Sequence, residues 1–195
     1  SLIIIMIMGV RQSLGLFLEP ISQFMKDGKE FFSFAIGFQA IIWGVVTFGL
    51  GILIDRFGPQ KVLAFGIICF ASGIFLMSTP NNQLTLFSAT SLMGFGLGGA
   101  GMATMVSIAG KVAPPEKRSF AMGLIAAAAS FGQFAVVLPT MWMNKTFGWE
   151  TSLIVLSIIT ISMLILLPLL NNTNEKVNQK GGFRNELQNT LLFSL

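Results

Sequence analysis

The chain is 195 residues long, and 53% of its residues are hydrophobic whereas only 10% are charged. Globular proteins carry about 25% charged residues, so this composition excludes a water-soluble domain and indicates a membrane protein. The net charge of +4 lies in short loops, which argues against nucleic-acid binding. The chain has no histidine and one cysteine, Cys69, which excludes histidine-dependent catalysis, an internal disulfide and metal sites built from histidines or several cysteines.

Six segments are apolar enough to cross a membrane as helices, which takes about 20 residues for a hydrocarbon core about 30 Å thick. The predicted spans are Ser1–Phe24, Ser33–Ile54, Val62–Met77, Leu84–Ala109, Ser119–Trp142 and Thr151–Leu170. Strands of a membrane barrel have about 10 residues of alternating polarity, which these runs lack. Pro20 and the charged residues 26–30 are expected to end the first span. The sequence therefore predicts an all-α membrane protein.

The basic residues of the loops predict an orientation, because cytoplasmic loops are enriched in lysine and arginine. The loops after the second, fourth and sixth spans hold eight of them: Arg56, Lys61, Lys111, Lys117, Arg118, Lys176, Lys180 and Arg184. The loops after the first, third and fifth spans hold three, namely Lys26, Lys29 and Lys145. Both ends of this segment are therefore expected on the cytoplasmic side.

The first span contains a charged residue, Arg11, eight residues before Glu19 and thus about 12 Å from the outer end of the helix. A charge at this depth costs several kcal/mol, about 3 on insertion scales, unless it faces a cavity or a partner. No carboxylate of the chain is expected at the same depth, and the guanidinium matches a carboxylate in shape. We therefore predict that Arg11 binds a small organic anion. The alternatives are an acidic partner in a missing second half, or contact with helix carbonyls.

Two glutamines lie deep in other spans. Gln39 is eight residues into the second span when counted from Phe31, at about the depth of Arg11, and Gln133 lies within the fifth span. Polar side chains at such positions either line a pathway or form hydrogen bonds between helices. Both are candidate substrate-binding residues, with bonding between helices as the alternative. Gln12 and Ser13, beside Arg11, are weaker candidates.

The loop after the second span holds a specific motif at residues 51–61. The positions that define it are Gly51, Leu53, Asp55, Arg56, Gly58 and Lys61. Gly51 allows close helix approach, Asp55 at a helix end requires a cation or a helix N-terminus, and Gly58 permits a tight turn. The alternative is an ordinary basic loop with one paired aspartate.

This motif resembles the signature between helices two and three of the major facilitator superfamily, G-x-L-x-D-R-x-G followed by basic residues; Pro59 and Gln60 depart from it. Residues 114–119, which include Arg118, resemble the family's connection between helices four and five. The resemblance implies the N-terminal six-helix half of a twelve-helix transporter. It further implies that the motif, with Arg118, forms a cytoplasmic gate between the two halves.

Residues 9–22, the second span around Gln39 and residues 131–134 resemble bacterial carriers of the monocarboxylate and oxalate/formate branch. The resemblance implies a symporter of a bacterial inner membrane. The proline-containing glycine signature of drug antiporters is not apparent in the fifth span. Residues 94–101 contain G-x-G-x-x-G, but a dinucleotide site would require a preceding strand. These small residues are instead expected to permit close packing and local bending.

An internal repeat is suggested by residues 33–37 and 119–123, which are identical at four of five positions and open the second and fifth spans. Because three helices separate them, the spans start from opposite sides, as in a 3+3 inverted repeat. Residues 1–170 are thus expected to form the six-helix bundle. The polar residues 171–195 are expected to form a cytoplasmic connector whose end could begin another helix, as part of a longer protein.

Together these features predict a secondary transporter that moves a small, monocarboxylate-like anion by alternating access. Its expected partners are the anion, the bilayer and a C-terminal half; no nucleic acid, cofactor, metal or enzyme activity is expected. The alternative within the fold is a carrier of sugars, drugs or amino acids. A six-span channel or membrane enzyme has less support, because paired Asn-Pro-Ala motifs and a Ser–His pair are lacking.

Overall fold

The computed structural model describes residues 2–25, 28–80 and 82–167, all in helices, 3₁₀ turns or the short links between them. Its elements are α1 (Leu2–Ser13), η1 (Leu14–Phe17), α2 (Leu18–Met25), α3 (Gly28–Phe57), α4 (Pro59–Met77), α5 (Gln83–Ala100), α6 (Met102–Val112), η2 (Pro115–Lys117), α7 (Arg118–Phe147), α8 (Trp149–Ser162) and η3 (Met163–Leu166). Within these ranges, six helical segments are long and apolar enough to cross a membrane, as predicted. The expected connector, residues 171–195, lies outside the described residues.

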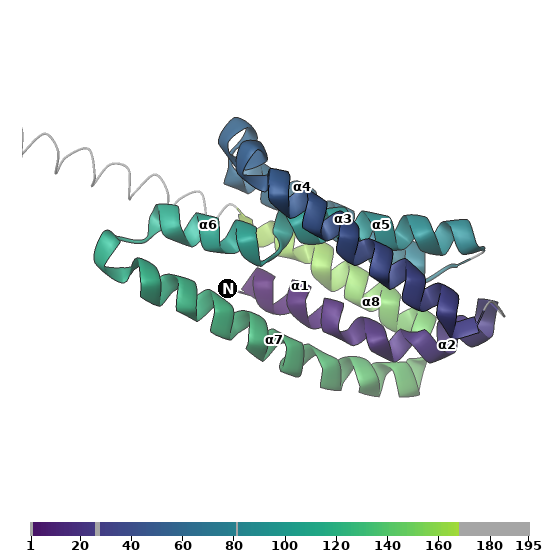
Figure 1. The fold of residues 1–195 in the computed structure, drawn as a ribbon. Coiled ribbons are helices and arrows are strands. Elements are labelled where there is room, and N and C mark those ends of the chain that lie inside the picture. The colour runs from purple at the N-terminus through teal and green to yellow at the C-terminus, as the bar shows by residue number, and fades with distance from the viewer. Residues whose placement is uncertain (1, 26–27, 81, 168–195) are drawn as a thin grey trace, which may run out of the picture.

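The six spans run back and forth along one direction and pack as a bundle (Figure 1). The first span packs on α7, α5 packs on both α3 and α4, and α4 also contacts α8. The core between them is apolar and centres on side chains such as Ile7, Ile67, Phe70 and Met93, all of which are fully buried. Burial of these side chains within the bundle leaves the longest helices, α3 and α7, at its margins.

The helix limits differ from the predicted ones mainly at polar ends. Helix α3 begins at Gly28 and ends at Phe57, and α7 extends to Phe147, because helices continue beyond the apolar stretch that defines a span. The expectation that Pro20 ends the first span is wrong. Pro20 is the third residue of α2, and the first turn of a helix does not use the backbone N–H that proline lacks.

Three of the six spans depart from regular α-helix. The first changes to a 3₁₀ turn at Leu14–Phe17, the sixth changes to one at Met163–Leu166, and the fourth breaks between α5 and α6 at Gly101, which has φ −77° and ψ −167°. The glycine-rich sequence before Gly101 predicted local bending, and the break lies at the end of that run. The side chain of Thr104 crosses the break and donates a hydrogen bond to the carbonyl of Gly98 at 3.3 Å.

The helix packing reveals the internal repeat. Eight described glycines lie so close to a neighbouring helix that an added Cβ would collide with it. Four of them form two matching pairs of contacts: Gly132 with Ile5 and Gly9 with Val136 between the first and fifth spans, and Gly94 with Ile42 and Gly98 with Val46 between the fourth and second spans. Positions in the first and fourth spans differ by 89 residues, and those in the second and fifth spans by 90.

The same two contacts therefore occur twice between the two three-helix units, once with the first span of the first unit and once with the first span of the second. The sequence match between residues 33–37 and 119–123 is offset by 86 residues, about one helical turn less than the register of the contacts. By the 89-residue register, Gly101 corresponds to Gln12, two residues before the 3₁₀ turn begins at Leu14. The interruptions of the first and fourth spans thus lie within about 3 Å of equivalent levels in the two units.

Candidate functional site

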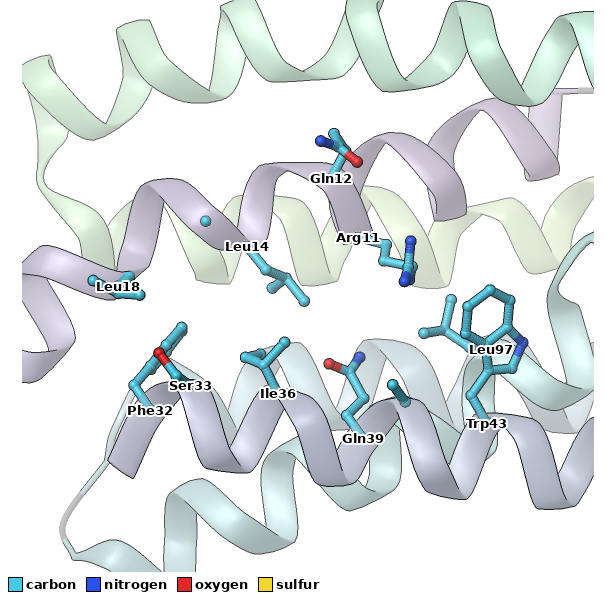
Figure 2. Close-up of a pocket in the computed structure, with 12 residues that line it drawn as sticks. Arg11, Gln12, Leu14, Leu18, Phe32, Ser33, Ile36, Gln39, Trp43 and Leu97 are labelled. Atoms are coloured by element: carbon cyan, nitrogen blue, oxygen red, sulfur yellow. The ribbon is translucent and has the colours of Figure 1, made fainter. Parts of the chain in front are cut away.

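A cavity of about 340 Å³ lies between the first span and α3, with Leu97 of α5 also in its wall. It is lined by Arg11, Gln12, Leu14, Gly15, Leu18, Phe32, Ser33, Ile36, Gln39, Ala40, Trp43 and Leu97. Figure 2 shows that Arg11 and Gln39 extend toward each other from the two facing helices. The equal depth predicted for these two residues therefore corresponds to one shared cavity.

Arg11 is half-buried, and its guanidinium carbon lies 4.6 Å from the centre of the Trp43 ring. This cation–π contact offsets part of the cost of placing a charge among apolar helices. None of the described residues that line the cavity is acidic. The positive charge therefore faces a cavity with an aromatic wall and is not neutralised by any side chain of that wall.

Gln39 is only 3% exposed, and its amide nitrogen Nε2 has no hydrogen-bond partner. A buried donor without an acceptor costs about 1–3 kcal/mol, which is why most buried polar atoms have a partner. The side chain points into the cavity beside Arg11 (Figure 2). The cavity therefore presents two kinds of donor, a guanidinium and an amide, to whatever occupies it.

The local structure of the first span holds Arg11 in place. The buried Ser13 hydroxyl donates to the carbonyl of Gly9 at 2.9 Å, and the α-helix ends immediately after it. In the 3₁₀ turn that follows, the carbonyl of Leu16 accepts a hydrogen bond from Asn144 of α7 at 3.3 Å. This bond ties the interrupted span to α7 beyond the cavity.

Trp43 is the cavity residue that the sequence analysis missed. It lies four residues after Gln39 on α3, and residues at this spacing share a face of a helix. Its position relative to Gln39 was therefore available from the sequence. Gln133, by contrast, is half-buried on α7 and does not line the cavity. Its assignment to a substrate pathway stays a prediction.

The motif at residues 51–61 forms the turn between α3 and α4. Gly58 has φ +84°, a conformation that favours glycine, and its N–H donates to the carbonyl of Ile54 at 2.9 Å. Pro59 then begins α4, and Ile54 packs with Leu50 and Val62 in a small apolar cluster. The tight turn predicted at Gly58 is present.

The remaining motif residues lie on the surface of the described structure. Asp55 and Arg56 are exposed, and the guanidinium carbon of Arg56 lies 5.5 Å from the centre of the Phe57 ring. No described atom lies within 4 Å of a Cβ built on Gly51, so the close helix approach expected there is not made within the described part of the chain. Arg118 begins α7 and donates from Nε to the carbonyl of Ala113 at 3.5 Å.

Comparison with known proteins adds the family. A family model described as Major Facilitator Superfamily matches residues 1–193. The chain is 27% identical to an agnestins efflux protein of Paecilomyces divaricatus, over 71% of this chain and 30% of that protein. It is 28% identical to an uncharacterized MFS-type transporter of Bacillus subtilis, over 82% of this chain and 39% of that protein.

A third relative carries the name "Probable 4-methylmuconolactone transporter" and comes from Cupriavidus pinatubonensis. The two are 28% identical over 63% of this chain and 34% of the relative. The chain thus spans between 30% and 39% of the length of these three relatives.

Proposed function

Because the chain belongs to the major facilitator superfamily and is an integral multi-pass membrane protein, we propose that it forms one half of a secondary transporter that moves a small organic anion by alternating access. The observation that carries this proposal is the pairing of Arg11 with the unpartnered Nε2 of Gln39 in one cavity. Both groups only donate hydrogen bonds. A carboxylate would accept from both and would bring the opposite charge that the cavity wall lacks.

A monocarboxylate-like substrate fits the rest of the cavity. Apart from Arg11, its wall carries no charged side chain, and the ring of Trp43 and side chains such as Leu14 and Ile36 are apolar. A substrate with one carboxylate and a small apolar body would match both parts. Among the relatives, one is named as a probable transporter of 4-methylmuconolactone. The agnestins efflux relative favours the alternative, a carrier of another solute class.

The exposed surfaces of α3 and α7 support a second six-helix half as partner. Only 11% of the most apolar stretch of each helix is buried, compared with 56% for α4. Three exposed apolar residues of α3 recur on α7 at the 90-residue register: Ile41 with Phe131, Phe48 with Leu138, and Ile52 with Trp142. On α3, Gly37, Gly44 and Gly51 have open space beside them and would let another helix approach closely.

With that half in place, we assign the gate to residues Gly51, Asp55, Arg56, Gly58, Lys61 and Arg118, on the cytoplasmic side. The turn between α3 and α4 exposes its charged residues to a partner. Gln133 is proposed to line the pathway from α7. The cell membrane of a bacterium is the proposed location.

The proposed substrate class is tested by uptake into proteoliposomes that contain the full-length protein. Labelled monocarboxylates would be compared with their neutral amides, which have nearly the same size. We expect the carboxylate to be taken up and the amide neither to be taken up nor to compete. Competition by the amide at the same concentration as the carboxylate would contradict an anion site and favour a carrier of neutral solutes.

Replacing Gln39 by Leu separates binding from folding. The variant Gln39→Leu removes a buried donor that has no partner, so the substrate-free protein should unfold at the same temperature or a higher one. The affinity for the carboxylate should fall about tenfold, because a hydrogen bond to a charged group is lost. Thermal unfolding and substrate-dependent stabilisation measure the two effects. A stable variant with unchanged affinity would remove Gln39 from the site.

A further inference from the structure

A second cavity lies between α3, α4 and α5, near the turn at Gly58, and has a volume of about 560 Å³. Its wall consists of Val46, Leu50, Leu53, Phe57, Lys61, Val62, Phe65, Phe95 and Gly99. Lys61 is the only polar side chain among these described residues. The groove is therefore apolar along its length, with a single cation at the end where α3 meets α4.

The groove has the length of an acyl chain within one leaflet. Its α3 wall runs from Val46 to Phe57, eleven residues or about 16 Å at the helical rise. One leaflet contributes about 15 Å of the hydrocarbon core. Lys61 is exposed and is the third residue of α4, so it lies at the end of the span, where lipid headgroups begin.

The groove opens toward lipid. Phe65 is 62% exposed, and the exposed side chains of Ile68 and Phe75 extend this apolar surface along α4. On α3, the groove residues lie about 160° around the helix from the exposed stripe at Ile41 and Phe48 that we assign to the second half. A partner bound to that stripe would leave the groove accessible from the bilayer.

We propose that this groove binds an anionic phospholipid, with one acyl chain between α3 and α4 and the headgroup phosphate at Lys61. The charge of the groove favours this occupant, because its only polar group is a cation and that cation lies at headgroup level. Basic groups between spanning helices on the cytoplasmic side commonly hold such headgroups. On the same turn the exposed Asp55 and Arg56 carry opposite charges, so the net positive charge there is that of Lys61.

Native mass spectrometry of the full-length protein tests the proposal. The purified protein would be incubated with phosphatidylglycerol or phosphatidylcholine of identical acyl chains, and the retained lipid would be counted. We expect phosphatidylglycerol to be retained in preference. Lys61→Gln should lower its retention about fivefold, the effect of one basic residue at a membrane surface. Leu53→Trp, which fills the groove, should lower the retention of both lipids.

Matched variants distinguish the groove from the rest of the surface. Lys117→Gln removes the same charge outside the groove, and Ile158→Trp adds the same ring on the exposed side of α8. Neither should change retention. Equal losses in Lys61→Gln and Lys117→Gln would show that only general surface charge attracts the lipid and would overturn the proposal, as would equal retention of the two lipids by the unmodified protein.

A photoactivatable phosphatidylglycerol with the reactive group in its acyl chain provides a measurement that needs no variant. Crosslinks should map to Leu53, Phe57 and Phe95. Crosslinks confined to other helices, or a groove occupied by a segment of the protein itself, would overturn the proposal. Neither result depends on what the Arg11 cavity transports.

Discussion

Arg11→Gln should abolish most carboxylate transport by the full-length protein, with the KM raised about 30-fold or more. Removing one member of a desolvated charge pair costs about 2–5 kcal/mol, and each 1.4 kcal/mol is a factor of ten. Arg11→Lys should have an intermediate effect, because it keeps the charge but loses the planar fork that matches a carboxylate. Initial rates of uptake into proteoliposomes measure both variants.

The stability of the same variants shows whether binding alone is affected. Arg11 has no acidic residue beside it in the cavity wall, so replacing it by Gln removes a costly charge from the span and should not lower the unfolding temperature. Lys145→Gln is the control, since this exposed lysine lies at the far end of α7 outside the cavity. Uptake by Arg11→Gln with an unchanged KM would refute the anion site, whereas the family assignment would stand.

Gly132→Ala should destabilise the protein by about 1–3 kcal/mol, the usual cost of overpacking. The new Cβ would collide with the backbone of Ile5, whose Cα lies 2.6 Å from the built position. The first span and α7 would have to separate, which would also break the contact of Gly9 with Val136 one turn away. Thermal unfolding in detergent, followed by circular dichroism or by thiol labelling of Cys69, measures the loss.

Gly123→Ala on the same helix is the matched control for this substitution. No described atom lies within 4 Å of its added Cβ. Alanine is favoured over glycine within a helix by about 0.5–1 kcal/mol, so this variant should be as stable as the unmodified protein or more so. Equal stability of the two variants would contradict the close contact between the first and fifth spans.

The sequence was sufficient to predict the number of spans and the all-helical fold, because 20-residue apolar runs allow few other structures. It also predicted that Arg11 and Gln39 lie at one depth, since helical rise converts residue counts into distance. The structure adds that both line one cavity. Whether two residues at one depth share a cavity depends on which faces of the first span and α3 meet. The sequence does not give this, because the rotation of each helix is set by its packing.

The packing itself depends on features that composition does not reveal. Gly94 and Gly98 make close contacts, but in sequence they cannot be distinguished from the other glycines of the same small-residue stretch. The helix of the first span continues past Pro20 because the preceding 3₁₀ turn places this proline in the first turn of α2. Trp43 was not among the predicted site residues, although its spacing from Gln39 places it on the same face of α3.

The matched interruptions at Leu14–Phe17 and Gly101 have a mechanical consequence. Each divides a span into two shorter rods joined where the hydrogen-bond ladder is irregular, at corresponding places of the two three-helix units. In the proposed alternating-access cycle, tilting about both joints at once would move the two ends of the bundle in opposite senses. Arg11, next to the first joint, would then lie close to the pivot and move little while either end opens.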